Sequence, residues 1–167
     1  MNTYQINALL ANVDCFEGTY PANHIFVTKS RPAAYVVNTS PYDEKVPPLA
    51  QGSHWIAIYL KHNGKGYYFD SFGLPPLQQE IQSFLEQSCP RGYKCNAQTL
   101  QHHSSRLCGV YCIDFLLFVS RGASLTDYLS VFTSDTKAND RSVSQRTECR
   151  LSTLLRRLKL NISTLMK

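Results

Sequence analysis

The stretch SHWIAIYLKHNGKGYYFD, residues 53–70, decides the fold of this chain. Its first half, Ser53–Lys61, has the pattern of a β-strand with two alternating faces. One face carries Trp55, Ala57 and Tyr59, and the other carries His54, Ile56, Ile58 and Leu60. A second aromatic run, Tyr67–Asp70, has the same strand character. Because the Asn63-Gly64 pair between them is a strong signal of a tight turn, the stretch predicts a β-hairpin.

Helices are expected on both sides of this hairpin, since the flanking segments carry apolar residues at helical spacing. We predict helices over residues 3–12, Leu77–Ser88, 108–120, 124–132 and from about Arg141, and strands over Ala34–Asn38 and Lys94–Leu100. Residues 13–33 have an irregular pattern, and residues 39–52 are typical of a polar loop. Helices and strands are grouped rather than alternating, which predicts an α+β fold. We expect one domain over residues 1–167, because no repeat or linker divides it.

The composition fits a chain that buries a core. Apolar residues make up 43% and charged residues 17%, which argues against a disordered polymer. No apolar run approaches the ~20 residues of a membrane helix, and the N-terminus lacks the pattern of a signal peptide. The six cysteines form no C-x-x-C pair, which argues against a zinc ribbon and favours free thiols in a reducing compartment.

Positive charge is concentrated at the C-terminal end, in roughly the last 45 residues, which are expected to be helical. Residues 137–167 hold eight Lys or Arg against Asp140 and Glu148, a net charge of +6 in a chain whose total is +5. Such a segment suits nucleic acid or an acidic partner, but a solvated helix face has the same composition, and both interpretations stay open. The same helix carries an apolar stripe that we expect to pack on the core, made of Leu151, Leu154, Leu155, Leu158 and Ile162.

Cys108 is the candidate nucleophile, because it begins the most apolar predicted helix. A helix N-terminus lowers the pKa of a thiol and stabilises the thiolate. Gly109 directly after it is expected to let a substrate backbone approach closely. A small buried residue at a helix start is the plain alternative. Cys112, one turn later, is expected to face the core.

Three further residues complete a possible acyl-transfer site. His54 lies early in the first hairpin strand and is the candidate general base, ahead of His62, His102 and His103, which fall in a turn or a loop. Asp70 ends the partner strand, where its carboxylate is placed to accept the imidazole Nδ1–H. Gln101, seven residues before Cys108, is the candidate oxyanion donor together with the Cys108 N–H.

Each residue alone is as readily a structural one, but the set in the order His54, Asp70, Gln101, Cys108 predicts cysteine hydrolysis. In the order of these four residues and in the sequence motifs around them, the chain resembles the adenovirus protease (adenain) family, in the clan that also contains SUMO-deconjugating proteases. The resemblance covers roughly residues 5–120. It is carried by the motifs GSHWIAIYL, YYFDSFG and QHHSSRLCGVYC, and extends to FEGTYPANHI and AAYVVNT.

The resemblance implies a fold with a mixed central sheet and the nucleophile at the N-terminus of a buried helix. It implies a triad of His54, Asp70 and Cys108, with Gln101 in the oxyanion hole and Trp55 packed beside the triad. Adenain carries Glu where this chain has Asp70, and either carboxylate can orient a histidine. No metal or small-molecule cofactor is implied.

The resemblance also implies a viral or mobile-element protease. Such an enzyme cleaves capsid precursors at Gly-containing sites during virion maturation. It would act in the host nucleus, a cytoplasmic viral factory or the virion, and would be neither secreted nor membrane-bound. Adenain is stimulated by DNA and by a viral peptide bound through a disulfide. Here Cys89 and Cys95 lie in the corresponding region, and neither is singled out.

Two rival functions remain open at this point. An isopeptidase that removes a SUMO-type modifier would use the same triad. A non-enzymatic zinc or DNA-binding module would use the four residues His102, His103, Cys108 and Cys112, but their spacing fits no standard zinc site.

Overall fold

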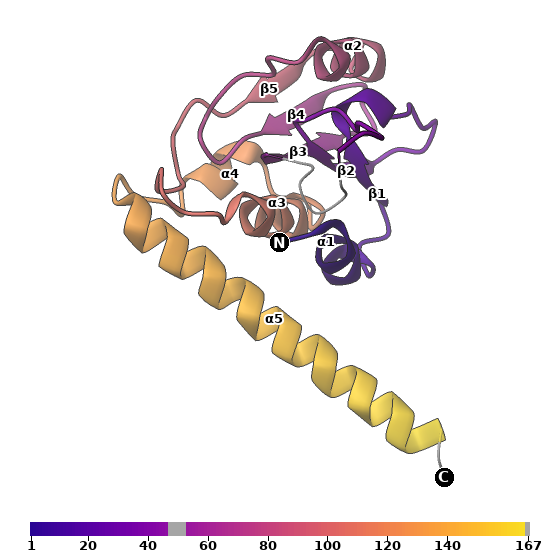
Figure 1. Cartoon of the computed structure of the whole chain (residues 1–167), viewed down its shortest axis with the longest axis vertical. Helices are drawn as coiled ribbons and strands as arrows, with labels where there is room; N and C mark the ends of the chain where they lie inside the picture. Colours follow the sequence, from indigo (N-terminus) through magenta and orange to yellow (C-terminus); the bar gives the residue numbers. More distant parts are fainter. Residues whose placement is uncertain (47–52, 166–167) are drawn as a thin grey trace.

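The computed structural model describes residues 1–46 and 53–165, with side chains through Arg150 and at positions 152–153. Its centre is a five-stranded sheet in the order β1-β2-β3-β4-β5 (Figure 1). The strands are β1 (Phe16–Pro21), β2 (Ala33–Asn38), β3 (Trp55–Leu60), β4 (Gly66–Phe69) and β5 (Tyr93–Cys95). β2, β3 and β4 are antiparallel neighbours, whereas the outer strands β1 and β5 run parallel to theirs. The predicted α+β fold with a mixed sheet is confirmed.

The hairpin predicted from residues 53–70 is the β3–β4 pair, with Tyr59 opposite Tyr67. Gly64 turns the chain with a φ of 73°, a left-handed conformation that favours glycine. β3 is shorter than the predicted Ser53–Lys61, and β4 begins and ends one residue earlier than the predicted Tyr67–Asp70. His54 therefore directly precedes β3, and Asp70 directly follows β4. The two residues therefore leave the ladder at the same end of the hairpin.

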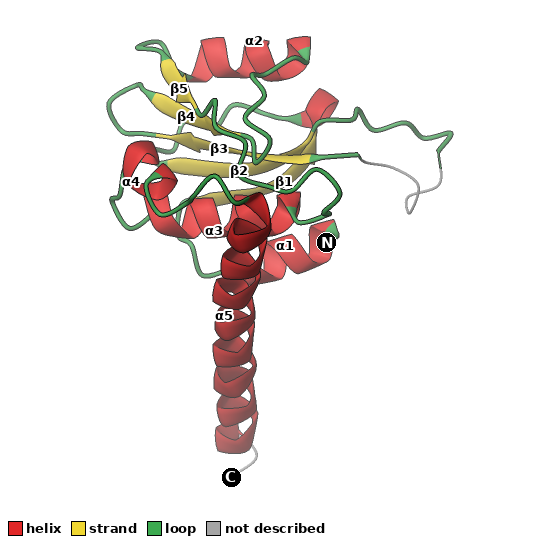
Figure 2. Cartoon of the chain, turned by 90° about the vertical axis from the view of Figure 1, so that its left-hand side faces the viewer, coloured by secondary structure: helices red, strands yellow, loops and turns green. Residues whose placement is uncertain are grey.

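The sheet is covered on both faces, as Figure 2 shows. On one face, Ala57 and Tyr59 of β3 join a core with α1 (Thr3–Leu10) and α3 (Cys108–Val119). On the other face, the intervening residues of β3 pack with α2 (Gln79–Ser88). The two alternating sets expected in this strand are thus both buried, one in each core.

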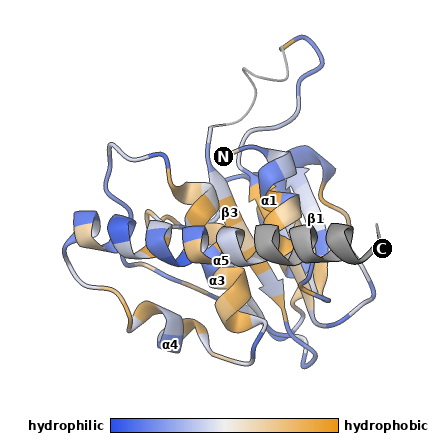
Figure 3. Ribbon diagram, turned by 90° about the horizontal axis from the view of Figure 1, so that it is seen from below, coloured by the Kyte–Doolittle hydropathy of each residue, from blue (hydrophilic) through white to orange (hydrophobic). Residues whose placement is uncertain are grey.

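Helix α3 is the buried centre of the first core. Nine of its twelve residues are buried, because it lies between the sheet, α1, α4 (Leu125–Leu129) and α5 (Thr136–Leu165). The figure seen from below shows α5 crossing α3 (Figure 3). Ser124 and Asp127 form a capping box at the start of α4, as the sequence predicts for Ser124.

Helix α5 begins five residues earlier than predicted. The Asp135 carboxylate accepts the backbone N–H groups of Lys137 and Ala138 at 3.0 Å each, which caps the first turn. Arg146 then anchors the helix to α3 through the buried Asp114, with a shortest contact of 2.7 Å. The predicted apolar stripe from Leu151 to Ile162 lies outside the described side chains.

The prediction of an irregular segment over residues 13–33 is wrong. It contains β1 and a short 3-10 helix, η1 (Ala22–His24). β1 escapes sequence analysis because it holds Gly18 and Pro21 and lacks alternation, and its half-buried residues form an edge strand with an irregular register at Gly18. β5 is shorter than predicted. The polar loop is irregular over residues 39–46, and its remainder, 47–52, lies outside the described residues.

Candidate active site

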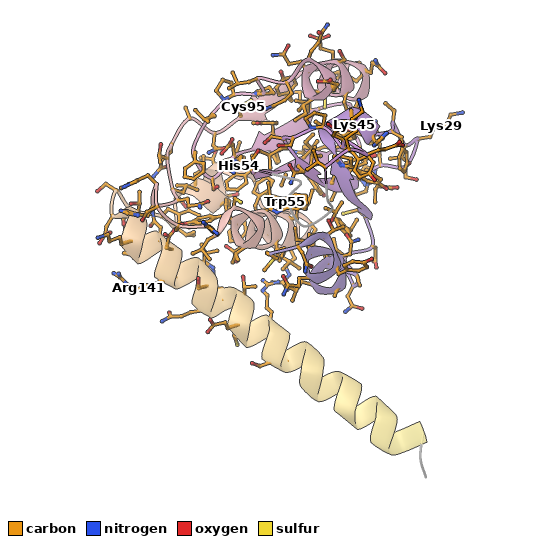
Figure 4. The ribbon with its side chains drawn as sticks, in the orientation of Figure 1. Lys29, Lys45, His54, Trp55, Cys95 and Arg141 are labelled. Atoms are coloured by element: carbon orange, nitrogen blue, oxygen red, sulfur yellow. The ribbon has the colours of Figure 1, made fainter. Side chains whose placement is uncertain are left out.

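Three predicted residues meet at one end of the sheet. His54 Nε2 lies 3.0 Å from Asp70 Oδ1, across the open end of the hairpin. The same imidazole also interacts with the thiol of Cys108, the first residue of α3. Figure 4 labels His54 and Trp55, which lie at the start of β3, on the side of the sheet toward α3. The structure therefore brings a thiol, an imidazole and a carboxylate into one chain of contacts.

The ring nitrogen that contacts the carboxylate differs from the prediction. Asp70 was expected to accept from Nδ1, but it lies against Nε2. Asp70 directly follows the neighbouring strand β4, and the distal nitrogen of the ring is the one that reaches it. This contact occupies Nε2, so Nδ1 is the ring nitrogen that remains available to the Cys108 thiol.

The contacts favour an ionised pair of His54 and Cys108. Burial disfavours the charged imidazole, but the hydrogen bonds with Asp70 and Cys108 outweigh burial and raise the pKa of His54 to about 9. Burial also works against the thiolate, yet the hydrogen bonds with His54 and with the backbone of Trp55 and Gly109 lower the pKa of Cys108. Leu107, the N-cap of α3, offers no side-chain hydrogen bond, so the helix start is open to an anion.

Asn96 holds the backbone of Asp70 in place and is not indicated by the sequence. Its side chain accepts the Asp70 N–H at 3.0 Å and donates to the Asp70 carbonyl oxygen at 2.6 Å. The Phe72 N–H also donates to Asp70 Oδ1, at 2.7 Å. Since Asn96 follows β5, only the pairing of β5 with β4 brings it to Asp70. No local pattern in the sequence marks it.

Gln101 lies beside Cys108 on the wall of the same cleft. It is 1% exposed, its Oε1 accepts from Ser71 Oγ at 2.7 Å, and its Nε2 donates to the Ser105 carbonyl oxygen at 2.9 Å. One amide N–H is thereby used, which leaves the other for a ligand in the cleft. This arrangement suits the predicted oxyanion donor.

The cleft at this site has a volume of about 750 Å³. One wall comes from the residues at the start of α1, and others come from the end of β1 and the loop after β2. Aromatic side chains, among them Tyr20, Trp55 and Phe72, alternate with polar ones along it. A cleft of this size, lined by aromatic and polar side chains, is large enough to hold a ligand.

Two proteins with related sequences come from viruses. A protease of bovine adenovirus 2 is 28% identical over 60% of this chain and 51% of its own length. A protein of Acanthamoeba polyphaga mimivirus that is named as a thiol protease, R355, is 32% identical over 47% of this chain and 29% of its own length. The matched part of the chain thus spans about half of the first relative and less than a third of the second. No protein-family model matches the chain.

The fold has been seen before in Chlamydia trachomatis. ChlaDub1 superposes with a TM-score of 0.52 and 23% identity over 72% of this chain and 61% of its own. The effector Cdu1, in a structure bound to ubiquitin, superposes with a TM-score of 0.52 and 20% identity, over 74% of this chain and 62% of its own. At these identities the likeness concerns the fold. The sequence relatives are viral proteases, and in the sense of this similarity the chain is adenain-like.

Two supporting residues of the adenain-like chain have different roles. Trp55 lies on the cleft beside the triad, and its indole N–H donates to the Met1 carbonyl oxygen at 3.3 Å. Gly109 is buried, and a Cβ there would lie 3.3 Å from Trp55 and 3.4 Å from Met1. Gly109 therefore allows Trp55 and the N-terminal residues to pack closely on α3. The approach of a substrate backbone to Gly109 stays a prediction.

The other cysteines discussed for this chain differ in the solvent exposure of their thiols. Cys112 is fully buried in the core as predicted, and burial raises its pKa well above the ordinary value. Cys89 is 4% exposed at the end of α2, whereas Cys95 is exposed on β5 (Figure 4). All six cysteines are free thiols.

The residues of the rival zinc module do not form a metal-binding group. The rings of His102 and His103 lie 4.2 Å apart between centroids and are tilted by 39°, and His102 Nδ1 contacts Ser104. Within residues 1–46 and 53–165, no three His, Cys, Asp or Glu side chains are placed to hold a metal ion. In the same part of the chain, no helix is long and apolar enough to cross a membrane.

Proposed function

We propose that this chain is a cysteine endopeptidase in which His54, Asp70 and Cys108 form the catalytic triad. The observation that carries the proposal is that His54 contacts both partners at once. Its Nε2 is held by the buried Asp70, and its other face meets the Cys108 thiol at the open end of α3. A nucleophile, a base and a group that orients the base are the parts that acyl transfer needs.

The reaction begins with the Cys108 thiolate attacking a peptide carbonyl carbon. As the C–S bond forms, the carbonyl electron pair moves to oxygen, which accepts hydrogen bonds from Gln101 Nε2 and the Cys108 N–H. The oxyanion then collapses, the C–N bond breaks, and the proton on His54 Nδ1 moves to the leaving amine. Neutral His54 next takes a proton from a water molecule, and the resulting hydroxide attacks the carbonyl carbon of the thioester. The C–S bond then breaks, which releases the carboxylic acid product and restores the Cys108 thiolate.

The proposed substrates are capsid precursor proteins of a virus or virus-like element, cut at Gly-containing sites during virion maturation. The named relatives support this proposal, since both are viral proteins called proteases. A nuclear, viral-factory or virion location would follow from that role. An activating peptide is part of the proposal, and of the two candidate cysteines only Cys95 is exposed enough to form a disulfide with it. DNA is the second proposed activator, bound by the basic C-terminal segment.

An isopeptidase acting on a ubiquitin-like modifier is the second candidate. It is favoured by the similarity in fold to the Chlamydia effector whose structure contains ubiquitin. The triad would perform the same chemistry on an isopeptide bond, so the two candidates differ in substrate recognition alone.

The test compares the wild type with Cys108→Ala on three substrates: a fluorogenic peptide amide ending in Gly-Gly, a linear ubiquitin fusion and a SUMO fusion. We expect the wild type to cleave the Gly-Gly peptide, and Cys108→Ala to keep its fold and lose all turnover. Cleavage of a modifier fusion alone would select the isopeptidase. Normal turnover by Cys108→Ala would refute the triad.

Iodoacetamide labelling gives a second readout that needs no substrate. Mass mapping of the six cysteines should show selective alkylation of Cys108 well below pH 8, lost in His54→Ala. Uniform slow labelling of the exposed thiols, with or without added DNA, would contradict an activated nucleophile.

A further inference from the structure

Ser71 links the two halves of the proposed active site. It directly follows Asp70, and it is completely buried. Its carbonyl oxygen accepts the backbone N–H groups of Leu100 and Gln101, at 2.9 and 3.0 Å. Its hydroxyl donates to Gln101 Oε1 at 2.7 Å. Three hydrogen bonds thus join the residue after the carboxylate to the segment that carries the oxyanion donor.

The contacts of Gln101 determine which way its amide points. The Ser105 carbonyl oxygen can only accept a hydrogen bond, so the group that faces it at 2.9 Å is the amide nitrogen. The amide oxygen must then face Ser71, and the Ser71 hydroxyl is the donor. Among the residues described, Ser105 is the only acceptor for this amide group, so the second N–H is free to serve the cleft.

Without the Ser71 hydroxyl, the amide loses one of the two contacts that hold it in this orientation. Gln101 Oε1 would be buried without a donor, since the residue is 1% exposed. A buried acceptor without a partner is unfavourable, so the side chain would rotate or shift to find another donor. Displacement of an oxyanion donor by an ångström is enough to weaken transition-state stabilisation.

We infer that Ser71 is a positioning residue that sets the direction of the Gln101 amide toward the oxyanion. The inference rests on the proposed function. Because Ser71 and Asp70 are adjacent, the two-residue segment directly after β4 orients both His54, through Asp70, and the oxyanion donor Gln101, through Ser71. Asn96 fixes that segment through its two hydrogen bonds to the Asp70 backbone.

The kinetic test is a double-mutant cycle with Ser71→Ala and Gln101→Ala on the Gly-Gly peptide amide. Loss of one oxyanion donor lowers kcat by about 100-fold or more, so Gln101→Ala should approach that loss and Ser71→Ala should lose roughly 10-fold. KM should change little in either variant. In the Gln101→Ala background, Ser71→Ala should cause no further loss, because it acts through that amide. Equal losses in both backgrounds would overturn the inference.

Ser88→Ala is the matched control. Ser88 is a buried serine, 2% exposed, whose hydroxyl has no hydrogen-bond partner in the described part of the chain. It should keep full kcat. His54-dependent alkylation of Cys108 should survive in Ser71→Ala, and its loss would mean that Ser71 supports the triad instead. Ser71→Cys, which keeps a weaker donor in a similar volume, takes its place in the cycle if Ser71→Ala fails to fold.

A last readout separates this inference from the proposed function. The side-chain amide protons of Gln101 should exchange slowly with solvent in the wild type and in Ser88→Ala, and faster in Ser71→Ala, as measured by NMR. Equal exchange in all three proteins would overturn the inference, even if the wild type is a fully active protease. A wild type that cleaves no substrate would refute the proposed function and leave the exchange result to decide the role of Ser71.

Discussion

Replacing Asp70 with asparagine removes the carboxylate that keeps His54 charged. The two side chains are 3.0 Å apart, with exposed fractions of 3% for Asp70 and 16% for His54, so solvent screens their attraction weakly. Burial opposes the imidazolium, and the hydrogen bond with Asp70 is the strongest of the contacts that raise the pKa of His54 from 6.5 to about 9. In Asp70→Asn we therefore expect that pKa to fall by at least one unit, or about 1.4 kcal/mol.

A lower pKa of His54 shifts the pH dependence of kcat/KM in a defined direction. His54 must carry a proton to release the leaving amine, and in the wild type it keeps that proton until the pH rises through about 9. The alkaline limb of kcat/KM should therefore lie near pH 9 and move to lower pH in Asp70→Asn. The raised pKa also stabilises the fold. That contribution is complete below pH 6.5 and is lost as the pH rises through about 9.

The assay measures kcat/KM between roughly pH 5 and 10 on the Gly-Gly peptide amide, spanning both limbs of the profile. Asp14→Asn is the control, because it removes the same charge at an exposed position. Asp70→Asn should retain some turnover, since the His54–Cys108 pair remains, whereas Cys108→Ala should retain none. An alkaline limb that stays near pH 9 in Asp70→Asn, or that moves as far in Asp14→Asn, would refute the reasoning.

Three further predictions concern packing, the buried ion pair and the C-terminal charge. In Gly109→Ala, the new Cβ lies 3.3 Å from Trp55, and we expect this crowding to lower the free energy of unfolding by about 1–3 kcal/mol. Because this loss exceeds the gain in helix propensity, the Tm should fall by several degrees. An unchanged Tm would contradict the close packing. Arg146→Ala leaves the carboxylate of Asp114, which is 4% exposed, without its cation. Since the Arg146 side chain is 35% exposed and solvent screens the pair in part, we expect the free energy of unfolding in urea to fall by about 2–3 kcal/mol. Arg141→Ala, which removes an exposed arginine, should leave it unchanged. Binding to duplex DNA should weaken linearly with log salt concentration, and an affinity independent of salt would exclude phosphate contacts by the basic segment.

Local patterns in the sequence were sufficient for the hairpin and for the central helix. Alternation in residues 53–61 and the Asn63-Gly64 turn predicted β3 and β4, and they placed His54 and Asp70 at the same end of the sheet. The apolar run after Cys108 predicted α3 with the thiol at its first residue. Such features are readable because they depend on neighbours within a few residues, where period and turn chemistry act directly.

The tertiary structure alone decided how the site is held together. Asn96 and Ser71 make their key contacts with residues 26 and 30 positions away, so these depend on the order and register of the strands. Which imidazole nitrogen faces Asp70 follows from the geometry between neighbouring strands, and the packing role of Gly109 follows from the approach of α1 and Trp55. Residue types in a sequence name the groups that can do chemistry, whereas long-range packing sets the direction in which each one points.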